Sequence, residues 1–177
     1  MLTCKNLAPL ALAALLTACA YNPNKPTGPS ATATLAATTG NTATGSLQFI
    51  QLPGKVRVHG EVHGLLPNTV HGFHIHEKGD CSSGDGLSAG GHFNPTAHAH
   101  GAPTGPMHHA GDLPSLQADA SGSAQISYET ADLAVGSGPN DVVGRGLIVH
   151  TDADDFTTQP TGNSGARLAC GVITRNP

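Results

Sequence analysis

One stretch decides how this chain is interpreted: HGFHIHE at 71–77, together with the loop that follows it to Asp112. Eight of the 11 histidines lie between His71 and Asp112. His74 and His76 are two positions apart, and side chains with that spacing in a strand point to the same face. Both imidazoles can then reach one ion, although a His-x-His pair alone is more often an ordinary surface pair. Neutral imidazole is the commonest metal ligand, so this dense cluster predicts a metal site.

The segments around this stretch have the patterns of short strands. Apolar and polar residues alternate with period two at 55–62, which predicts one face in a core and one in water. Similar signals occur at 31–38, 45–52, 70–77, 123–130, 142–149 and 168–173. Glycine (23) and proline (13) are abundant and there is no tryptophan, which favours strands joined by turns. About eight short strands without helical periodicity predict an all-β fold, an antiparallel sandwich or barrel.

Two long loops interrupt this pattern, at 79–114 and 151–167. Long loops without apolar periodicity are usually functional or disordered, and the histidines favour function here. His92, His100, His109 and Asp112 follow one another at intervals of eight, nine and three. Loop ligands that include one carboxylate suit tetrahedral zinc, whereas an all-imidazole set suits copper.

The N-terminal 30 residues have the composition of an export signal and a tether. Residues 1–18 combine Lys5 with a short apolar run, as in a signal peptide, and the run is too short to cross a bilayer. The small residues before Cys19 resemble a bacterial lipoprotein signal, in which this cysteine is lipidated. An ordinary secretory signal cut nearby is the alternative. The proline-rich residues 19–30 are expected to link the anchor to a domain at 31–177.

Four cysteines and the charge balance limit the compartment and the partners. Cys4 is expected to leave with the signal and Cys19 would be lipidated, so Cys81 and Cys170 would remain as a pair in an oxidising compartment. They form either a disulfide or two free buried thiols. A bridge across about 90 residues contributes on the order of 4 to 5 kcal/mol at most in the chain-entropy model. The net charge is −4 and the basic residues are scattered, which argues against a nucleic-acid partner.

Three motifs in order make the pattern specific: GFHIHE at 72–77, SAGGHFNP at 88–95 and GARLACGV at 165–172. They resemble the copper–zinc superoxide dismutases, in register from about residue 31 to 173. The resemblance implies an eight-stranded antiparallel Greek-key β-sandwich or barrel. It also implies an enzyme with one copper and one zinc per subunit. Such an enzyme converts two superoxide anions to O₂ and H₂O₂ by Cu(II)/Cu(I) cycling, with the zinc structural.

The resemblance also implies roles for individual residues. The copper ligands fall on His74, His76, His92 and His150, and the zinc ligands on His92, His100, His109 and Asp112. His92 would bridge the two metals and take part in catalysis. Arg167 would attract the anionic substrate, Asp154 would hydrogen-bond one ligand of each metal, and Cys81 and Cys170 would form a disulfide. The position of Cys81 directly after Asp80 resembles the bacterial periplasmic branch.

The remaining histidines and basic residues are predicted to lie outside the site. His71 matches a packing histidine, while His98 and His108 are expected to be solvent-exposed loop residues, with adventitious metal binding as the alternative. His59 and His63 are expected on a water-facing strand surface, and Lys78 and Arg145 as ordinary surface charges. The segment 156–163 has no lysine or glutamate, so the source of electrostatic steering stays open, with Lys55, Arg57 and Lys78 as candidates.

These features together predict antioxidant defence in the cell envelope. The expected partner is superoxide, and membrane contact is expected only through lipidated Cys19, in the periplasm and at the outer membrane. The chain would be a monomer or a homodimer, and superoxide from a host and from the cell's own metabolism are both compatible with it. A copper or zinc buffer without activity is the main rival, but the four copper-type histidines and Arg167 argue against it. A structural lipoprotein with incidental histidines does not explain the spacing.

Overall fold

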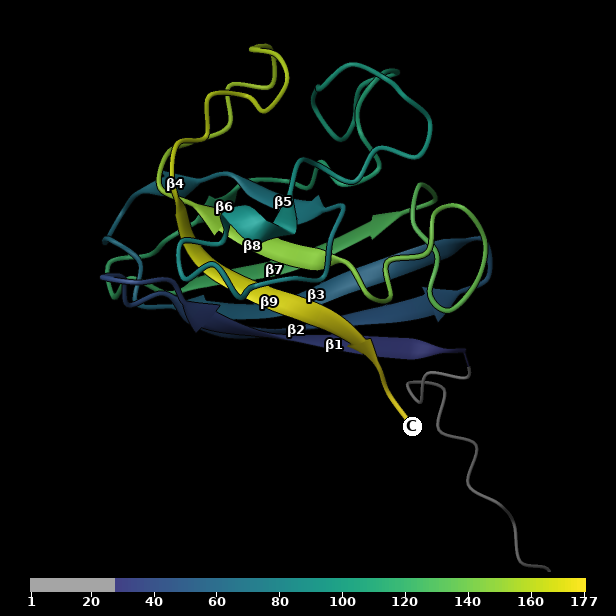
Figure 1. Cartoon of the computed structure of the whole chain (residues 1–177), viewed down its shortest axis with the longest axis horizontal. Helices are drawn as coiled ribbons and strands as arrows, with labels where there is room; N and C mark the ends of the chain where they lie inside the picture. Colours follow the sequence, from purple (N-terminus) through teal and green to yellow (C-terminus); the bar gives the residue numbers. More distant parts are fainter. Residues whose placement is uncertain (1–27) are drawn as a thin grey trace, which may run out of the picture.

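The computed structural model describes residues 28–177, which contain nine strands and one short 3-10 turn joined by loops (Figure 1). The elements are β1 (Ser30–Ala37), β2 (Thr44–Leu52), β3 (Lys55–His63), β4 (Val70–His71), β5 (Phe73–His76), η1 (Leu87–Ala89), β6 (Leu116–Gln117), β7 (Ala124–Thr130), β8 (Gly146–His150) and β9 (Arg167–Arg175). The predictions of a signal at 1–18, of lipidated Cys19 and of a linker up to residue 27 lie outside the described residues. Within 28–177, no helix has the length and apolarity to cross a membrane.

Seven strands form one antiparallel sheet in the order β5-β8-β9-β1-β2-β3-β7, and β4 pairs with β6. The hairpin-connected strands β1, β2 and β3 are neighbours, and β9 returns from the end of the chain to pair with β1. The spatial order β9-β1-β2-β3 is the Greek-key arrangement. The predicted all-β, antiparallel fold is therefore confirmed.

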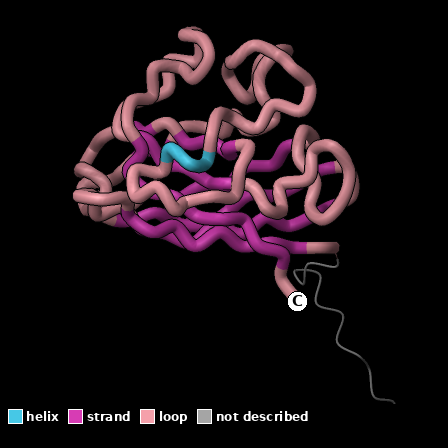
Figure 2. Tube along the Cα trace, viewed as in Figure 1, coloured by secondary structure: helices cyan, strands magenta, loops and turns pink. Residues whose placement is uncertain are grey.

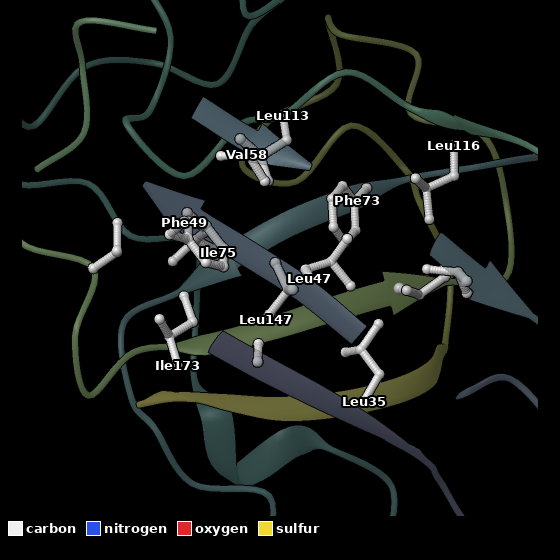
Figure 3. Packing of buried hydrophobic residues seen from close by; sticks show 14 of the residues in the cluster. Leu35, Leu47, Phe49, Val58, Phe73, Ile75, Leu113, Leu116, Leu147 and Ile173 are labelled. Atoms are coloured by element: carbon white, nitrogen blue, oxygen red, sulfur yellow. The ribbon is translucent and has the colours of Figure 1, made fainter. Parts of the chain in front are cut away.

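The core lies between the two curved halves of this sheet. In β3 the buried Val56, Val58 and Val62 alternate with polar residues such as exposed Arg57, as the period-two pattern predicts. Figure 3 shows side chains from β1, β2, β3, β5, β8 and β9 meeting in one cluster. Its largest fully buried members include Leu35, Leu47, Phe49, Phe73, Ile75, Leu147 and Ile173.

The strand predicted at 70–77 is divided at Gly72. Its amide donates to the Asp152 carbonyl at 2.7 Å, and its carbonyl accepts from His150 N–H at 2.9 Å. A Cβ at this position would overlap the Ser164 side chain. Gly72 thus switches the chain from β4, paired with β6, to β5, paired with β8.

Two other boundaries differ from the sequence prediction. The strand predicted from 142 begins at Gly146, because a turn closed by Arg145 N–H and the Val142 carbonyl (3.1 Å) precedes it. Gly144, in that turn, has φ +80°, which is unfavourable for other residues. The two-residue strand β6 and the single turn η1 were not predicted, since neither is long enough to show a period.

Both long loops emerge on the same side of the molecule, above β5 and β8 (Figures 1 and 2). The predicted disulfide is confirmed: Cys81 and Cys170 are bonded, with their Cα atoms 5.8 Å apart. The bond attaches the start of the first long loop to β9, which also carries Arg167.

Candidate metal centre

Strand β5 positions the first histidines, and both of its edges are occupied. One edge pairs with β8, in the register Phe73 to Val149 and His76 to Gly146. The other edge binds the long loop, where Ile75 accepts from Phe93 N–H at 2.8 Å and donates to the Gly111 carbonyl at 2.9 Å. The loop therefore behaves locally as an additional strand, and this brings its histidines beside those of β5.

The predicted ligands come together in two groups that share one residue. Within each group, one ligand atom per residue lies within 4.8 Å of the others. The first group, the four-histidine cluster, is His74, His76, His92 and His150. The second group, the aspartate cluster, is His92, His100, His109 and Asp112. All seven residues are buried, and His92 belongs to both clusters.

Hydrogen bonds from outside orient the rings of the four-histidine cluster. Nδ1 of His76 donates to the Gly90 carbonyl at 2.8 Å, and Nδ1 of His150 donates to the Gly165 carbonyl at 3.3 Å. The opposite Nε2 atoms of these two rings then lie 3.4 Å apart, facing one another. Such bonds fix the tautomer, which leaves a lone pair on each Nε2 directed into the cluster.

In the aspartate cluster, three rings converge on one carboxylate. Asp112 Oδ1 lies 2.8 Å from His92 Nδ1 and 3.2 Å from His109 Nδ1, and Oδ2 lies 3.1 Å from His100 Nδ1. Backbone N–H groups of Gly101 and His109 donate to Oδ2 at 3.2 and 2.8 Å. These backbone bonds fix the carboxylate so that it faces the three imidazoles.

Three buried ring nitrogens in these clusters have no hydrogen-bond partner: His74 Nδ1, His92 Nε2 and His100 Nδ1. The contact of His100 Nδ1 with Asp112 is close but lacks hydrogen-bond geometry. Unpartnered buried polar atoms are costly, and native proteins rarely keep them without a reason. A metal ion held by each cluster would supply the missing partners. Four imidazoles suit copper, and three imidazoles with a carboxylate suit zinc.

Asp154 connects the two clusters through hydrogen bonds to one histidine of each. Its Oδ2 accepts from His74 Nε2 at 2.6 Å, and its Oδ1 accepts from His100 Nε2 at 2.9 Å. Phe156 N–H holds the same Oδ1 at 2.7 Å. One carboxylate therefore sets the orientation of one ring from each cluster. Gly162 packs against this pair, and a Cβ there would overlap Asp154 Oδ1.

Burial and hydrogen bonding set opposite protonation preferences. Burial lowers the pKa of His92 to about 4 and that of His150 to about 3. Burial acts to lower the pKa of His100, but the hydrogen bond to Asp154 and the close contact with the Asp112 carboxylate outweigh it and raise this pKa to about 9. In Asp112, burial acts to raise the pKa, yet the close contacts with the rings of His100, His109 and His92 keep this pKa well below the ordinary value. His92 and His150 are thus neutral at pH 7, as metal binding requires.

Arg167, at the start of β9, lies opposite His150 in the strand register. Its guanidinium donates to the carbonyls of Gly86 and, at 2.7 Å, Gly90. Gly90 O also accepts from His76, so one carbonyl connects the arginine to the four-histidine cluster. Gly90 has φ +75°, and a Cβ there would overlap Glu77, so the residue needs to be glycine. Burial, with a smaller contribution from the charge of Arg167, lowers the pKa of both His76 and His150.

Most residues predicted to lie outside the clusters do so. His71 is buried, donates from Nδ1 to the His150 carbonyl at 2.8 Å and contacts Thr69 Oγ1, as a packing residue. His98 is exposed, as predicted. His108 also lies outside both clusters, but the prediction that it is solvent-exposed was wrong, because its side chain is only 13% exposed and contacts Asp132.

The basic residues divide into three kinds. Arg145 is not an ordinary surface charge, because it donates to the Glu77 carbonyl at 2.7 Å and covers the Phe93 ring at 4.3 Å. Lys55 and Arg57 both pair with Glu129, which offsets the charge they were expected to offer for steering. Lys78 is exposed, as predicted.

Sequence reasoning missed Gln159, whose side chain forms two hydrogen bonds with the backbone of His100. The amide oxygen accepts from His100 N–H and the amide nitrogen donates to the His100 carbonyl, both at 2.9 Å. This amide clamp connects the second long loop to a residue of the aspartate cluster. The sequence carried no signal for it, since a lone glutamine in a loop has no typical role.

A family model described as copper/zinc superoxide dismutase matches residues 43–173. The chain belongs to this family. A superoxide dismutase [Cu-Zn] of Onchocerca volvulus is 42% identical over 147 residues, which cover 76% of this chain and 90% of the relative. Superoxide dismutase [Cu-Zn] 2 of Mesembryanthemum crystallinum is 44% identical over 140 residues, or 75% of this chain and 88% of the relative.

A solved structure supports the same fold. The crystal structure of the clock protein EA4 has a TM-score of 0.75 and 41% sequence identity to this chain. The match covers 82% of this chain and 93% of that one. As a copper/zinc superoxide dismutase, the chain is an oxidoreductase whose cofactors are copper and zinc, and its two histidine clusters are compatible with both metals.

Proposed function

We propose that this superoxide dismutase holds copper in the four-histidine cluster and zinc in the aspartate cluster, with His92 as the shared ligand. The observation that carries the assignment is the membership of His92 in both clusters. Its Nδ1 lies 2.8 Å from Asp112, while its Nε2 is buried without a partner on the other side. A deprotonated imidazole has a lone pair on each ring nitrogen and can therefore serve two ions.

Bound copper supplies the redox chemistry, because it alternates between two oxidation states while one superoxide is oxidised to O₂ and a second is reduced to H₂O₂. The net reaction consumes two superoxide anions and two protons. His92 Nε2 has no protein partner, so it is free either to bind metal or to hold one of these protons. His92 Nδ1 and Asp112 would both hold the zinc, so the ring would keep its place while Nε2 changes its role.

Arg167 is assigned to substrate attraction. The protein has a net charge of −4, which opposes the approach of an anion. The two carbonyls that accept from Arg167 fix its guanidinium beside the four-histidine cluster. A guanidinium stays protonated at working pH, so a fixed positive charge is always present beside the proposed copper site. Local focusing by such a charge can outweigh a repulsive net charge.

The first experiment compares superoxide decay by the metal-loaded and metal-free domain, together with metal analysis. We expect one copper and one zinc per chain, and activity only in the loaded protein. His92→Ala is expected to lose zinc and most of the activity, whereas His98→Ala, which alters an exposed neighbour on the same loop, should keep both. Native metal content and activity in His92→Ala would refute the bridge. Metal binding without activity in the loaded wild-type protein would instead favour a metal buffer.

We also propose that the chain is of the bacterial periplasmic type, exported and anchored through lipidated Cys19. The signal-like residues 1–18 support this, and a disulfide suits an oxidising compartment. Relatives from Brugia pahangi and Haemonchus contortus carry the name extracellular superoxide dismutase. Cys19→Ser should move the protein from the membrane fraction to the soluble envelope fraction. An unchanged membrane fraction would contradict the anchor.

A further inference from the structure

A small cavity of about 90 Å³ lies beside the first long loop, outside both metal clusters. Three side chains with metal-binding groups line it, His98, His108 and Asp132, together with Asn140. They come from separate segments: the two histidines from different parts of the loop, and Asp132 from just beyond β7. None of the three is used by the two metal clusters.

The ring of His108 is held in a fixed tautomer. Its Nδ1 lies 3.1 Å from the Gly105 carbonyl, which can only accept, so Nδ1 carries the hydrogen. Nε2 lies 3.3 Å from Asp132 Oδ2. A lone pair on Nε2 that faces a carboxylate oxygen is repelled unless a cation or a proton lies between them. The same Oδ2 accepts from Thr130 Oγ1 at 2.7 Å, which holds the carboxylate in this position.

His98 lines the same cavity and offers a third donor. Its backbone is fixed in both directions by Asn94, whose side chain donates to the His98 carbonyl at 2.8 Å and accepts from His98 N–H at 3.1 Å. The residue is exposed, and ion binding would require its ring to turn toward His108 and Asp132, which are already in contact.

We propose that His98, His108 and Asp132 form a peripheral site for a divalent cation such as Zn²⁺ or Cu²⁺. Two imidazoles and one carboxylate are donors that these ions accept, with water or the Asn140 amide oxygen completing the coordination. The cation is held at the surface of the loop that carries His109 of the aspartate cluster. The site goes beyond the two metals of the proposed function, and it is tested with both of those already bound.

The test is calorimetric titration of Zn²⁺ into the protein loaded with copper and zinc. We expect one further Zn²⁺ per chain. His98→Gln and Asp132→Asn should each weaken its binding at least about ten-fold, the lower end of what loss of a supporting group costs a metal site. The control His63→Gln removes an exposed histidine on β3, away from the cavity, and should leave the binding unchanged.

Metal analysis and superoxide decay of each loaded variant check that the buried clusters are intact, and both should match the wild-type protein. If Asp132→Asn fails to fold, His98→Gln decides alone, because His98 is exposed. Absence of a further Zn²⁺ would overturn the proposal and leave His108 and Asp132 as a simple ion pair. Further Zn²⁺ binding that His98→Gln leaves unchanged, or that His63→Gln abolishes, would overturn it as well.

Discussion

At the scale of single residues, the site depends on which ring nitrogen each histidine leaves free. His76 and His150 use Nδ1 for backbone carbonyls and keep Nε2 for the cluster, whereas His74 uses Nε2 for Asp154 and keeps Nδ1. The outer partner thus decides the inner ligand atom. Because burial lowers the pKa of His92 to about 4, the shared ring stays free of a second proton at neutral pH.

Arg167→Ala should slow superoxide decay by about ten-fold or more at low ionic strength, since a fixed charge beside the four-histidine cluster is lost. Copper and zinc contents should remain native, because the guanidinium contacts only backbone carbonyls. Arg167→Lys keeps the charge but not the forked geometry, and should be intermediate. The measurement is the decay rate against salt concentration. An unchanged rate at low salt would remove Arg167 from substrate attraction.

Gly162→Ala should disturb the carboxylate that connects the two clusters. An added Cβ would overlap Asp154 Oδ1 and crowd His100, and φ is +66°. The backbone conformation alone costs about 1 kcal/mol. We expect the variant to release zinc to a chelator faster than the wild-type protein. Gly54→Ala is the matched control, since it shares a positive φ of +75° but meets no atom within 4 Å. Equal zinc retention in both variants would show that the Asp154 link does not hold the metal.

At the scale of elements, the sequence predicted regular strands well and loop contacts poorly. The alternation in β3 and the HGFHIHE stretch were readable because each residue's environment depends on a period of two. The break at Gly72 was not, because it depends on hydrogen bonds to Asp152 and His150, far along the chain. The proposed ligand residues could be named from the family motifs. The partners that orient them are largely backbone carbonyls, such as Gly90 and Gly165, and a sequence pattern does not reveal these.

The amide clamp of Gln159 connects the two long loops, so it should govern how long zinc stays bound. Gln159→Ala removes both bonds to His100, while Gln159→Glu keeps an acceptor for His100 N–H but loses the donor to its carbonyl. We expect zinc release to be fastest in Gln159→Ala and intermediate in Gln159→Glu. With both metals saturating, superoxide decay should stay near the wild-type rate. Zinc release at the wild-type rate in Gln159→Ala would contradict the role of the clamp.

At the scale of the whole molecule, the sheet provides the frame and the loops provide most of the proposed ligands. His74, His76 and His150 lie on β5 and β8, whereas the remaining four residues of the two clusters lie on the first loop. The disulfide ties the start of that loop to β9, so the loop is anchored covalently as well as by the β5 edge. Because these anchored segments bury the clustered histidines, the stability of the metal-free protein depends on the protonation state of those histidines.

This coupling gives a prediction for pH. An imidazole in the unfolded chain has a pKa of about 6.5. The pKa of His92 is lowered to about 4 and that of His150 to about 3, so below pH 6.5 the unfolded chain binds more protons and stability falls with falling pH. The pKa of His100 is raised to about 9, so from pH 6.5 to 9 the folded protein binds more protons and stability falls with rising pH.

Urea unfolding of the metal-free protein, with its disulfide intact, should therefore show maximal stability near pH 6.5. Bound zinc replaces the proton on His100 and should abolish the alkaline decline. A steady rise in the stability of the metal-free protein up to pH 9 would contradict the pairing of His100 with Asp112 and Asp154.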